Sequence, residues 1–154
     1  MLLKRKTSAE TLKLQEKYGV PYLVFPSLEN TGLVRHAFST RLGGCSTGDL
    51  ATMNLSSTRG DDPENVKENF RRFGAAVGFD PKDLVLSLQT HTTNVRLVTE
   101  EDRGKGFTRP RDYKDVDGLI TNVPGLVLAT FYADCVPLYF VDPVHRAIGL
   151  SHSG

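Results

Sequence analysis

The 154-residue sequence contains no tryptophan, two cysteines and four histidines, and its 19 Lys+Arg against 18 Asp+Glu leave a net charge of +1. The two cysteines, Cys45 and Cys135, lie far apart, which argues against a disulfide scaffold. Balanced charge gives no electrostatic basis for binding nucleic acid or anionic membranes, which need clustered Lys and Arg. No run approaches the ~20 apolar residues that span a bilayer. The basic residues Lys4 to Lys6 precede a polar stretch, unlike a signal peptide. We therefore expect a soluble, cytoplasmic protein with reduced thiols.

Residues 1–32 are expected to form an N-terminal helix and arm. Thr7-Ser8-Ala9-Glu10 has the spacing of a capping box, in which a hydroxyl and a carboxylate satisfy two backbone amides. This spacing predicts a helix to about Tyr18, with Gly19 as its C-terminal stop. The segment Val20 to Phe25 has prolines at its edges and is typical of an edge strand or extended arm.

The strongest helix signal begins at Asp62, a good N-cap followed by a proline, and ends at Gly78. Apolar residues with helical spacing lie between them: Val66, Phe70, Phe73 and Val77. Short β-branched and aromatic runs predict strands at 34–39, 84–88, 95–98, 118–121, 126–132, 138–141 and 147–150. Residues 41–53 are a predicted loop, and residues 102–114 a predicted exposed loop. The late strands are too close together for crossover helices, so the pattern predicts an α+β layered fold in one domain over 1–154.

Three candidate metal ligands stand where an apolar strand gives way to small polar residues. His91 follows Gln89-Thr90, Cys135 follows Ala133-Asp134, and His152 lies in Ser-His-Ser-Gly. Strand ends are where a rigid sheet delivers side chains to a site. Two imidazoles and one thiolate suit Zn²⁺ and leave a fourth position for water, as in a catalytic zinc site. Zinc lowers the pKa of bound water to about 7, which gives a nucleophilic hydroxide at neutral pH.

The same residues allow other interpretations. Cys135 could be a buried apolar side chain, or the nucleophile of a Cys-His hydrolase with His152 or His91 as its base. His36 is a core histidine or lines the same cleft, and His145 is a predicted turn residue. Cys45, in a Gly-rich loop, is more simply incidental.

One loop could hold an anion. Arg41 stands beside the pair Gly43-Gly44, and a guanidinium with the amides of a Gly-rich turn can bind phosphate or carboxylate, although a solvated arginine is the simpler interpretation. Asp115 and Asp117 could be a carboxylate pair, but turn formation explains them equally well.

Seven segments together resemble the YfiH family of laccase-domain, polyphenol-oxidase-like proteins, regarded as purine nucleoside phosphorylases. The resemblance covers about residue 33 to the end. It is carried by His36-Ala37-Phe38-Ser39-Thr40-Arg41-Leu42-Gly43-Gly44, Met53-Asn54-Leu55, Gly60-Asp61-Asp62-Pro63 with Val66 and Asn69, Gln89-Thr90-His91, Asp117-Gly118-Leu119-Ile120-Thr121, Ala133-Asp134-Cys135-Val136-Pro137 and Ser151-His152-Ser153-Gly154. The sequence departs from the family at Thr92, where a glycine is usual, and in a longer 102–114 loop.

The resemblance implies a fold of stacked β-sheets flanked by helices, with Zn²⁺ held by His91, Cys135 and His152. It implies phosphorolysis of adenosine, inosine, guanosine and methylthioadenosine, with nucleoside and phosphate as partners, and adenosine deamination. Arg41 and Asn54 match positions that line the cleft and would hold phosphate or ribose. Asp134 is expected to orient the site from behind a ligand. Copper oxidase chemistry is rejected, because four histidines cannot supply a trinuclear cluster and a blue-copper site.

Two alternatives remain open. Some members of the family edit a peptidoglycan precursor, so a zinc hydrolase of that kind is possible. Family members also continue beyond the His-x-Gly motif, so we expect an incomplete domain whose C-terminal part is missing. A non-catalytic fragment would then bind a partner, either as a homo-oligomer or with a complementing C-terminal chain.

Overall fold

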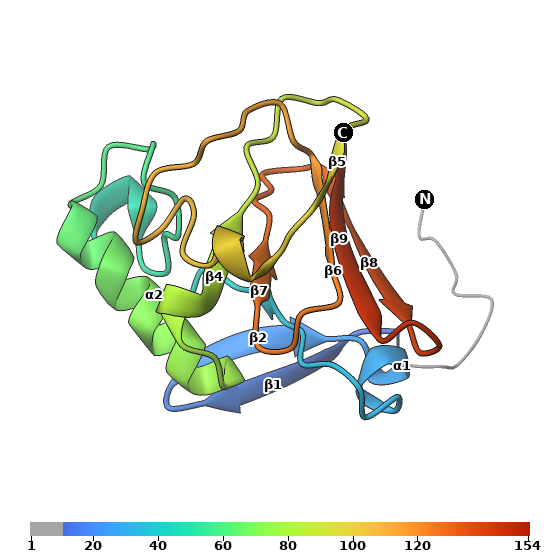
Figure 1. The fold of residues 1–154 in the computed structure, drawn as a ribbon. Helices are drawn as coiled ribbons and strands as arrows, with labels where there is room; N and C mark the ends of the chain where they lie inside the picture. The colour runs from blue at the N-terminus through green and yellow to red at the C-terminus, as the bar shows by residue number, and fades with distance from the viewer. Residues whose placement is uncertain (1–10) are drawn as a thin grey trace, which may run out of the picture.

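Three β-sheets and one long helix form the part of the chain that the computed structural model describes, residues 11–154 (Figure 1). The elements in order are β1 (Lys13–Lys17), β2 (Val20–Val24), α1 (Pro26–Glu29), β3 (Phe38–Ser39), α2 (Pro63–Val77), β4 (Leu84–Leu86), β5 (Val95–Leu97), β6 (Gly118–Thr121), β7 (Val127–Ala129), β8 (Val136–Asp142) and β9 (Ala147–Ser153). Short 3₁₀ turns lie at Gly48–Leu50, Pro81–Asp83 and Glu100–Asp102.

The predicted N-terminal helix is wrong where the structure describes it. Residues Lys13–Lys17 form β1, which pairs antiparallel with β2, and the capping box at 7–10 lies outside the described residues. Tyr18 (φ 54°) and Gly19 (φ 74°) form the two-residue turn between these strands. Two successive positive φ angles are the geometry of the commonest hairpin turn, so Gly19 closes a hairpin and does not end a helix.

The position of β2 also differs from the prediction. Val20–Val24 is a strand, as expected, but it lies between β1 and β3 and is the central strand of its sheet. Pro21 is tolerated there because the pairing with β3 covers only Tyr22 and Leu23, so β3 does not need the amide that proline lacks. The predicted strand at 34–39 is shortened to β3, Phe38–Ser39.

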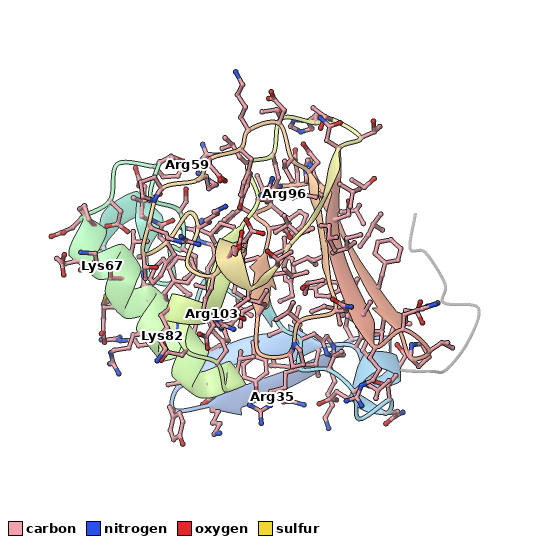
Figure 2. The ribbon with its side chains drawn as sticks, viewed as in Figure 1. Arg35, Arg59, Lys67, Lys82, Arg96 and Arg103 are labelled. Carbon is pink, nitrogen blue, oxygen red and sulfur yellow. The ribbon has the colours of Figure 1, made fainter. Side chains whose placement is uncertain are left out.

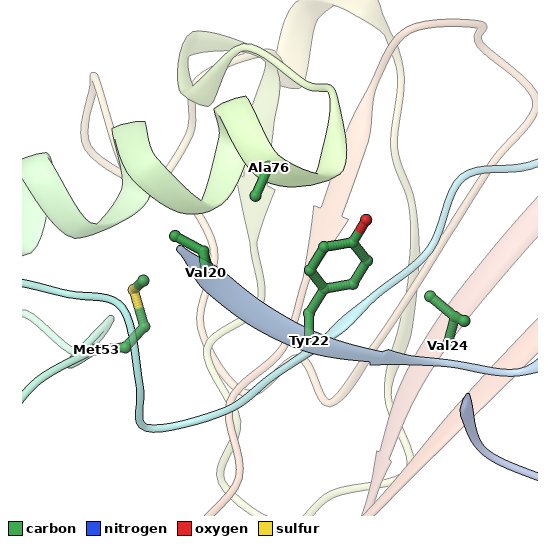
Figure 3. Packing of buried hydrophobic residues seen from close by; sticks show 5 residues of the cluster. All are labelled: Val20, Tyr22, Val24, Met53 and Ala76. Carbon is green, nitrogen blue, oxygen red and sulfur yellow. The ribbon is translucent and has the colours of Figure 1, made fainter. Parts of the chain in front are cut away.

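Helix α2 has the predicted ends and covers one face of β2. The Asp62 side chain accepts a hydrogen bond from the Glu64 amide, and Gly78 ends the helix with φ 95°. Figure 3 shows Ala76 of α2 above the side chains of β2. This core cluster, whose members are at most 7% exposed, consists of Val20, Tyr22, Val24, Met53 and Ala76. Burial of these apolar groups stabilises the packing of α2 on the first sheet.

The four-stranded sheet has the order β5-β6-β9-β8 and two unlike faces. β6 pairs antiparallel with β9, and β9 with β8, as the close spacing of the late strands predicts, whereas β5 runs parallel to β6. Alternation along the strands turns Leu119 and His152 to the inner face, where both are buried. The outer face carries large exposed apolar side chains: Val95, Leu97, Ile120, Val136, Leu138 and Phe140.

The segment 102–114 is a loop, but it is not exposed throughout. Lys105 is 8% exposed, and its Nζ binds Asp102 Oδ1 at 2.7 Å and Asp112 Oδ2 at 2.9 Å. Burial opposes the charge of Asp102, but hydrogen bonds from Lys105, the Thr99 amide and Arg96 outweigh it and hold the pKa of that carboxyl well below its usual range. The segment holds five Lys and Arg residues, which is typical of an exposed loop, but one of them, Lys105, is buried with acidic partners.

Most of the basic side chains labelled in Figure 2 have acidic partners. Lys67 pairs with Glu64, Lys82 with Asp80, Arg96 with Asp102, and Arg103 with Glu100 and Asp83. Local neutralisation of this kind agrees with the balanced composition.

The layered α+β fold predicted from the sequence is confirmed, and the single-domain assignment over 1–154 stays a prediction. Within residues 11–154, no helix is both long enough and apolar enough to cross a membrane.

Candidate metal centre

One group of metal-ligating side chains converges among the described residues. The ligand atoms of His91, Cys135 and His152 all lie within 4.8 Å of one another. His91 Nε2 is 3.8 Å from Cys135 Sγ, and the rings of His91 and His152 have centroids 4.8 Å apart. These are the three metal-ligand candidates from the sequence. His91 and Cys135 are 44 residues apart in the chain, and Cys135 and His152 are 17 residues apart.

His91 is positioned by a turn that folds around a carboxylate. The chain leaves β4 and reaches His91 with φ 64°, a left-handed conformation that is uncommon for a residue other than glycine. The amides of Thr90 and Thr92 donate to Asp117 Oδ1 at 2.9 and 3.1 Å, and the amide of His91 donates to Asp117 Oδ2 at 3.1 Å. Three consecutive amides around one carboxylate fix the backbone that carries the imidazole.

His152 is positioned by the pairing of β6 with β9. It is 8% exposed, its amide donates to the Asp117 carbonyl at 2.8 Å, and its Nδ1 lies 2.7 Å from Asp117 Oδ2. Burial opposes ionisation of Asp117, but the amides of Thr90 and Thr92 and the contact with His152 lower its pKa to about 2. The ionised carboxylate only accepts hydrogen bonds, so Nδ1 is the donor in this contact and Nε2 is the nitrogen left to bind a metal.

Cys135 lies between β7 and β8, where Gln89 ties its segment to the His91 segment. Gln89 Nε2 donates to the Phe131 carbonyl at 2.6 Å, and the Phe131 amide donates to Gln89 Oε1 at 2.7 Å. Desolvation, and then the neighbouring Asp134 carboxylate, raise the pKa of the Cys135 thiol. Because a cysteine acts as the thiolate both as a nucleophile and as a metal ligand, this direction favours neither interpretation of Cys135.

The donor set fits a transition metal such as zinc. Metal–ligand bonds of about 2.0–2.3 Å place the ligand atoms of a tetrahedral site about 3.5 Å apart, which small side-chain movements would reach here. The backbone at Gly154 leaves room for the His91 ring, since a Cβ at that position would clash with His91 Cδ2. A metal there would have three protein ligands and one open position.

A broad cleft of about 2070 Å³ lies beside the three candidate ligands. Its lining includes the three ligands together with Arg41, Asn54 and Asp134, the other site residues predicted from the sequence. Asp134 Oδ1 is 3.7 Å from Cys135 Sγ, so Asp134 adjoins a ligand. Among the described residues, the side chains of Arg41 and Asn54 make their hydrogen bonds within their own loops and none with the three ligands.

The loop bonds of Arg41 and Asn54 hold both side chains in place. Arg41 Nη2 donates to the carbonyls of Asp49 and Ala51 at 2.7 and 3.1 Å. Asn54 Nδ2 donates to the Ser56 carbonyl at 3.1 Å and to Asp61 Oδ2 at 2.8 Å. Both side chains are therefore fixed at the cleft before any ligand arrives.

The remaining histidines and Cys45 lie outside the metal centre. His36 Nε2 accepts a hydrogen bond from the Phe25 amide at 2.7 Å, and its ring lies against Phe25 and Tyr139. It is thus a structural histidine that also lines the cleft. His145 lies in the turn between β8 and β9, as predicted, and its Nδ1 binds Asp142. Cys45 Sγ contacts Asn69 on α2.

Sequence reasoning did not give Asp117 or Gln89 a role at the site. The sequence leaves Asp117 open between a carboxylate pair with Asp115 and turn formation, although Asp117 immediately precedes a predicted strand. Pairing that strand with the last one would have revealed it, because the register that sets Gly118 opposite Ser151 sets Asp117 opposite His152. Gln89 carries no sequence signal beyond its place in the motif.

Comparison with known proteins gives a consistent picture. The family model described as multi-copper polyphenol oxidoreductase laccase matches residues 35–154. A purine nucleoside phosphorylase of Deinococcus radiodurans is 40% identical over 136 residues, which are 88% of this chain and 48% of the relative. The purine nucleoside phosphorylase YlmD of Geobacillus stearothermophilus is 38% identical over 120 residues, or 75% of this chain and 43% of that protein.

Solved structures share the fold. The crystal structure of YlmD from Geobacillus stearothermophilus matches with a TM-score of 0.81 and 35% identity over 95% of this chain and 53% of that one. The hypothetical protein YfiH of Bacillus licheniformis also matches with a TM-score of 0.81, at 32% identity, over 92% of this chain and 52% of that one. The chain spans about half the length of these two curated relatives and of these two solved structures.

The environment of His36 predicts acid sensitivity of the fold. Burial lowers the pKa of His36 from 6.5, against opposing effects of Glu29 and the Phe25 amide. A lowered histidine pKa means that folding releases a proton, so the stability from neutral His36 is present above pH 6.5 and is lost as pH falls below it. We expect His36→Gln to flatten the pH dependence of the unfolding free energy between about pH 7 and 5, in denaturant titrations. The exposed His145→Gln is the matched control, and equal slopes for wild type and His36→Gln would contradict the prediction.

Proposed function

The chain belongs to the multi-copper polyphenol oxidoreductase laccase family, and on that premise we propose that it carries the metal site of a zinc-dependent purine nucleoside phosphorylase. The observation that carries the proposal is the convergence of His91, Cys135 and His152 within 4.8 Å at the edge of a cleft. The names of the relatives support the reaction class. The proposed substrates are phosphate with adenosine, inosine, guanosine or methylthioadenosine, and adenosine deamination is the proposed second activity.

Zinc is proposed in preference to copper because of the type and number of the ligand side chains. Two imidazoles and one thiolate suit zinc and leave a fourth position open. Within residues 11–154 a single group of three such ligands converges, whereas a multicopper oxidase needs a trinuclear cluster and a further copper site. When bound, zinc would supply a Lewis acid at the edge of the cleft.

Phosphorolysis requires a phosphate held beside the anomeric carbon of the nucleoside. A phosphate oxygen forms a bond to that carbon as the bond to the purine nitrogen breaks, and the purine leaves with the electron pair and takes up a proton. Arg41 is proposed to hold the phosphate. Its two loop contacts both use Nη2, and the N–H groups of Nε and Nη1 are suited to an oxyanion.

Asn54 and Asp134 are proposed to complete the substrate side of the site. Asn54 Oδ1 accepts one hydrogen bond, from the Ser56 amide at 3.0 Å, and keeps a second lone pair for a ribose hydroxyl. Asp134 adjoins Cys135 on the cleft side and is proposed to orient the centre from there. Asn54 would then lie beside the nucleoside and Asp134 beside a metal ligand, and neither would bind the metal itself.

The metal proposal predicts a stoichiometry. Purified protein should contain about one zinc per chain, because three ligands and one open position make one site. Cys135→Ala should lose the metal, as measured by elemental mass spectrometry after dialysis. Cys45→Ala removes a thiol outside the centre and should keep it. A zinc-free wild-type protein with normal phosphorolysis would contradict the proposed zinc dependence.

The phosphate role of Arg41 predicts a specific kinetic change. Losing a charge-assisted hydrogen bond of about 1.5–3 kcal/mol raises the KM for phosphate roughly 10–100-fold in Arg41→Ala. The control is Arg71→Ala, which removes an exposed guanidinium paired with Glu68 on α2.

The assay offers adenosine with phosphate and, in parallel, a peptidoglycan precursor. Turnover of the precursor alone would reject the nucleoside function, and an unchanged KM for phosphate would reject the role of Arg41.

The outer face of the four-stranded sheet supports a proposal about partners. Phe140 is 54% exposed and Leu97 61% exposed, and contiguous apolar faces of this kind mark interaction surfaces. We propose that a second polypeptide covers this face, either another copy of the chain or a complementing C-terminal chain.

Light scattering tests the first form of this proposal. We expect the mass of two or more chains for wild type and of one chain for Phe140→Glu, because a buried carboxylate opposes association. Leu14→Glu on β1, where Leu14 is 62% exposed, is the matched control on another sheet. A folded, active wild-type monomer would contradict a covering partner.

A further inference from the structure

Asp117 contacts both histidines of the candidate metal centre. It is 2% exposed and lies directly before β6. Its carboxylate accepts hydrogen bonds from the amides of Thr90, His91 and Thr92 and from His152 Nδ1, and the Thr92 hydroxyl lies 3.4 Å from Oδ1. One buried carboxylate therefore joins two chain segments that are about 60 residues apart in sequence.

On the His91 side, the carboxylate holds a turn that the backbone does not prefer. A positive φ at a residue other than glycine costs of order 1 kcal/mol and persists only where the surroundings impose it. Here the surroundings are the three amides that point to Asp117. Without the Asp117 carboxylate, the amides of Thr90 and His91 have no other described hydrogen-bond acceptor. The direction of the His91 imidazole is then no longer fixed.

On the His152 side, the same residue fixes both the ring and its tautomer. The Asp117 carbonyl accepts the His152 amide, and Oδ2 accepts from Nδ1. The ring is thus held at its backbone and at its far side. The proton is kept on Nδ1, which leaves the Nε2 lone pair for a metal.

We propose that Asp117 is the positioning residue that assembles the two histidine ligands into one site. The inference rests on the proposed metal function. It adds that hydrogen bonds to Asp117 hold the two histidine ligands in place in the metal-free protein. Asp134, which the sequence suggested for orientation, contacts the cysteine and neither histidine among its described hydrogen bonds. The two aspartates therefore act on different ligands.

Asp115 provides a matched control in the same loop. Its Oδ1 accepts a hydrogen bond from the Thr90 hydroxyl at 3.0 Å, so it too touches the His91 turn, but it makes no described contact with His152. Asp115→Asn and Asp117→Asn change the same functional group two residues apart. Only the second removes the link between the histidines.

The first test measures zinc affinity by competition with a chelator, with circular dichroism and thermal unfolding of each metal-free variant to verify folding. Either orientation of the asparagine amide in Asp117→Asn sets its NH₂ group against N–H donors, of the His91 turn or of His152. We expect its zinc affinity to fall about 10–100-fold, and that of Asp115→Asn to change less than about twofold. A folded Asp117→Asn with wild-type zinc affinity overturns the inference.

The second test needs no variant and no metal. Long-range ¹H–¹⁵N NMR of metal-free wild-type protein reports which nitrogen of His152 carries the proton. We expect the Nδ1–H tautomer, and an Nε2–H tautomer overturns the inference. Because this measurement uses the wild-type protein, it still tests the role of Asp117 if the Asp117→Asn variant does not fold. A wild-type protein without zinc but with the Nδ1–H tautomer would reject the proposed function while leaving the role of Asp117 intact.

Discussion

The antiparallel pairing of β6 with β9 is the constraint on which the candidate site depends. Its register sets Gly118 opposite Ser151, and therefore Asp117 opposite His152. Because side chains alternate between faces, a slip of one residue would turn His152 to the outer face of the sheet and remove it from the other ligands. Leu150, which lies on the same face of β9 as His152 and opposite Leu119 of β6, would turn outward with it, and this loss of apolar burial opposes such a slip.

Local signals explain what the sequence predicted well. Helix α2 has an N-cap, a proline, an apolar stripe and a terminal glycine within one short stretch, and the structure uses each of them. The strands around residues 84–86, 118–121 and 147–153 follow β-branched runs bounded by turn residues. The three ligand candidates were found because each stands at a strand end or near one, which is a local property. That they meet follows from pairings that no local pattern specifies.

Tertiary contacts explain the errors. Residues 13–17 form a strand because β2 offers a pairing partner, and Gly19 suits a hairpin turn as well as a helix end. The charged segment after residue 102 looked solvent-exposed because its acidic partners were not recognisable in advance. Asp117 shows the same limit. Its type and position fitted a turn, and its contacts with two distant segments became visible only once β6 and β9 were paired.

The ligands come from segments attached to different sheets. His91 follows β4, which pairs with β7, whereas Cys135 precedes β8 and His152 lies within β9 of the four-stranded sheet. An ion bound to all three would therefore act as a cross-link between sheets and would close chain loops of 44 and 17 residues. Closing such loops lowers the entropy of the unfolded chain. Metal occupancy and resistance to unfolding or proteolysis would then rise and fall together, so the supply of metal in the cell would govern how long the protein persists as well as what it can do.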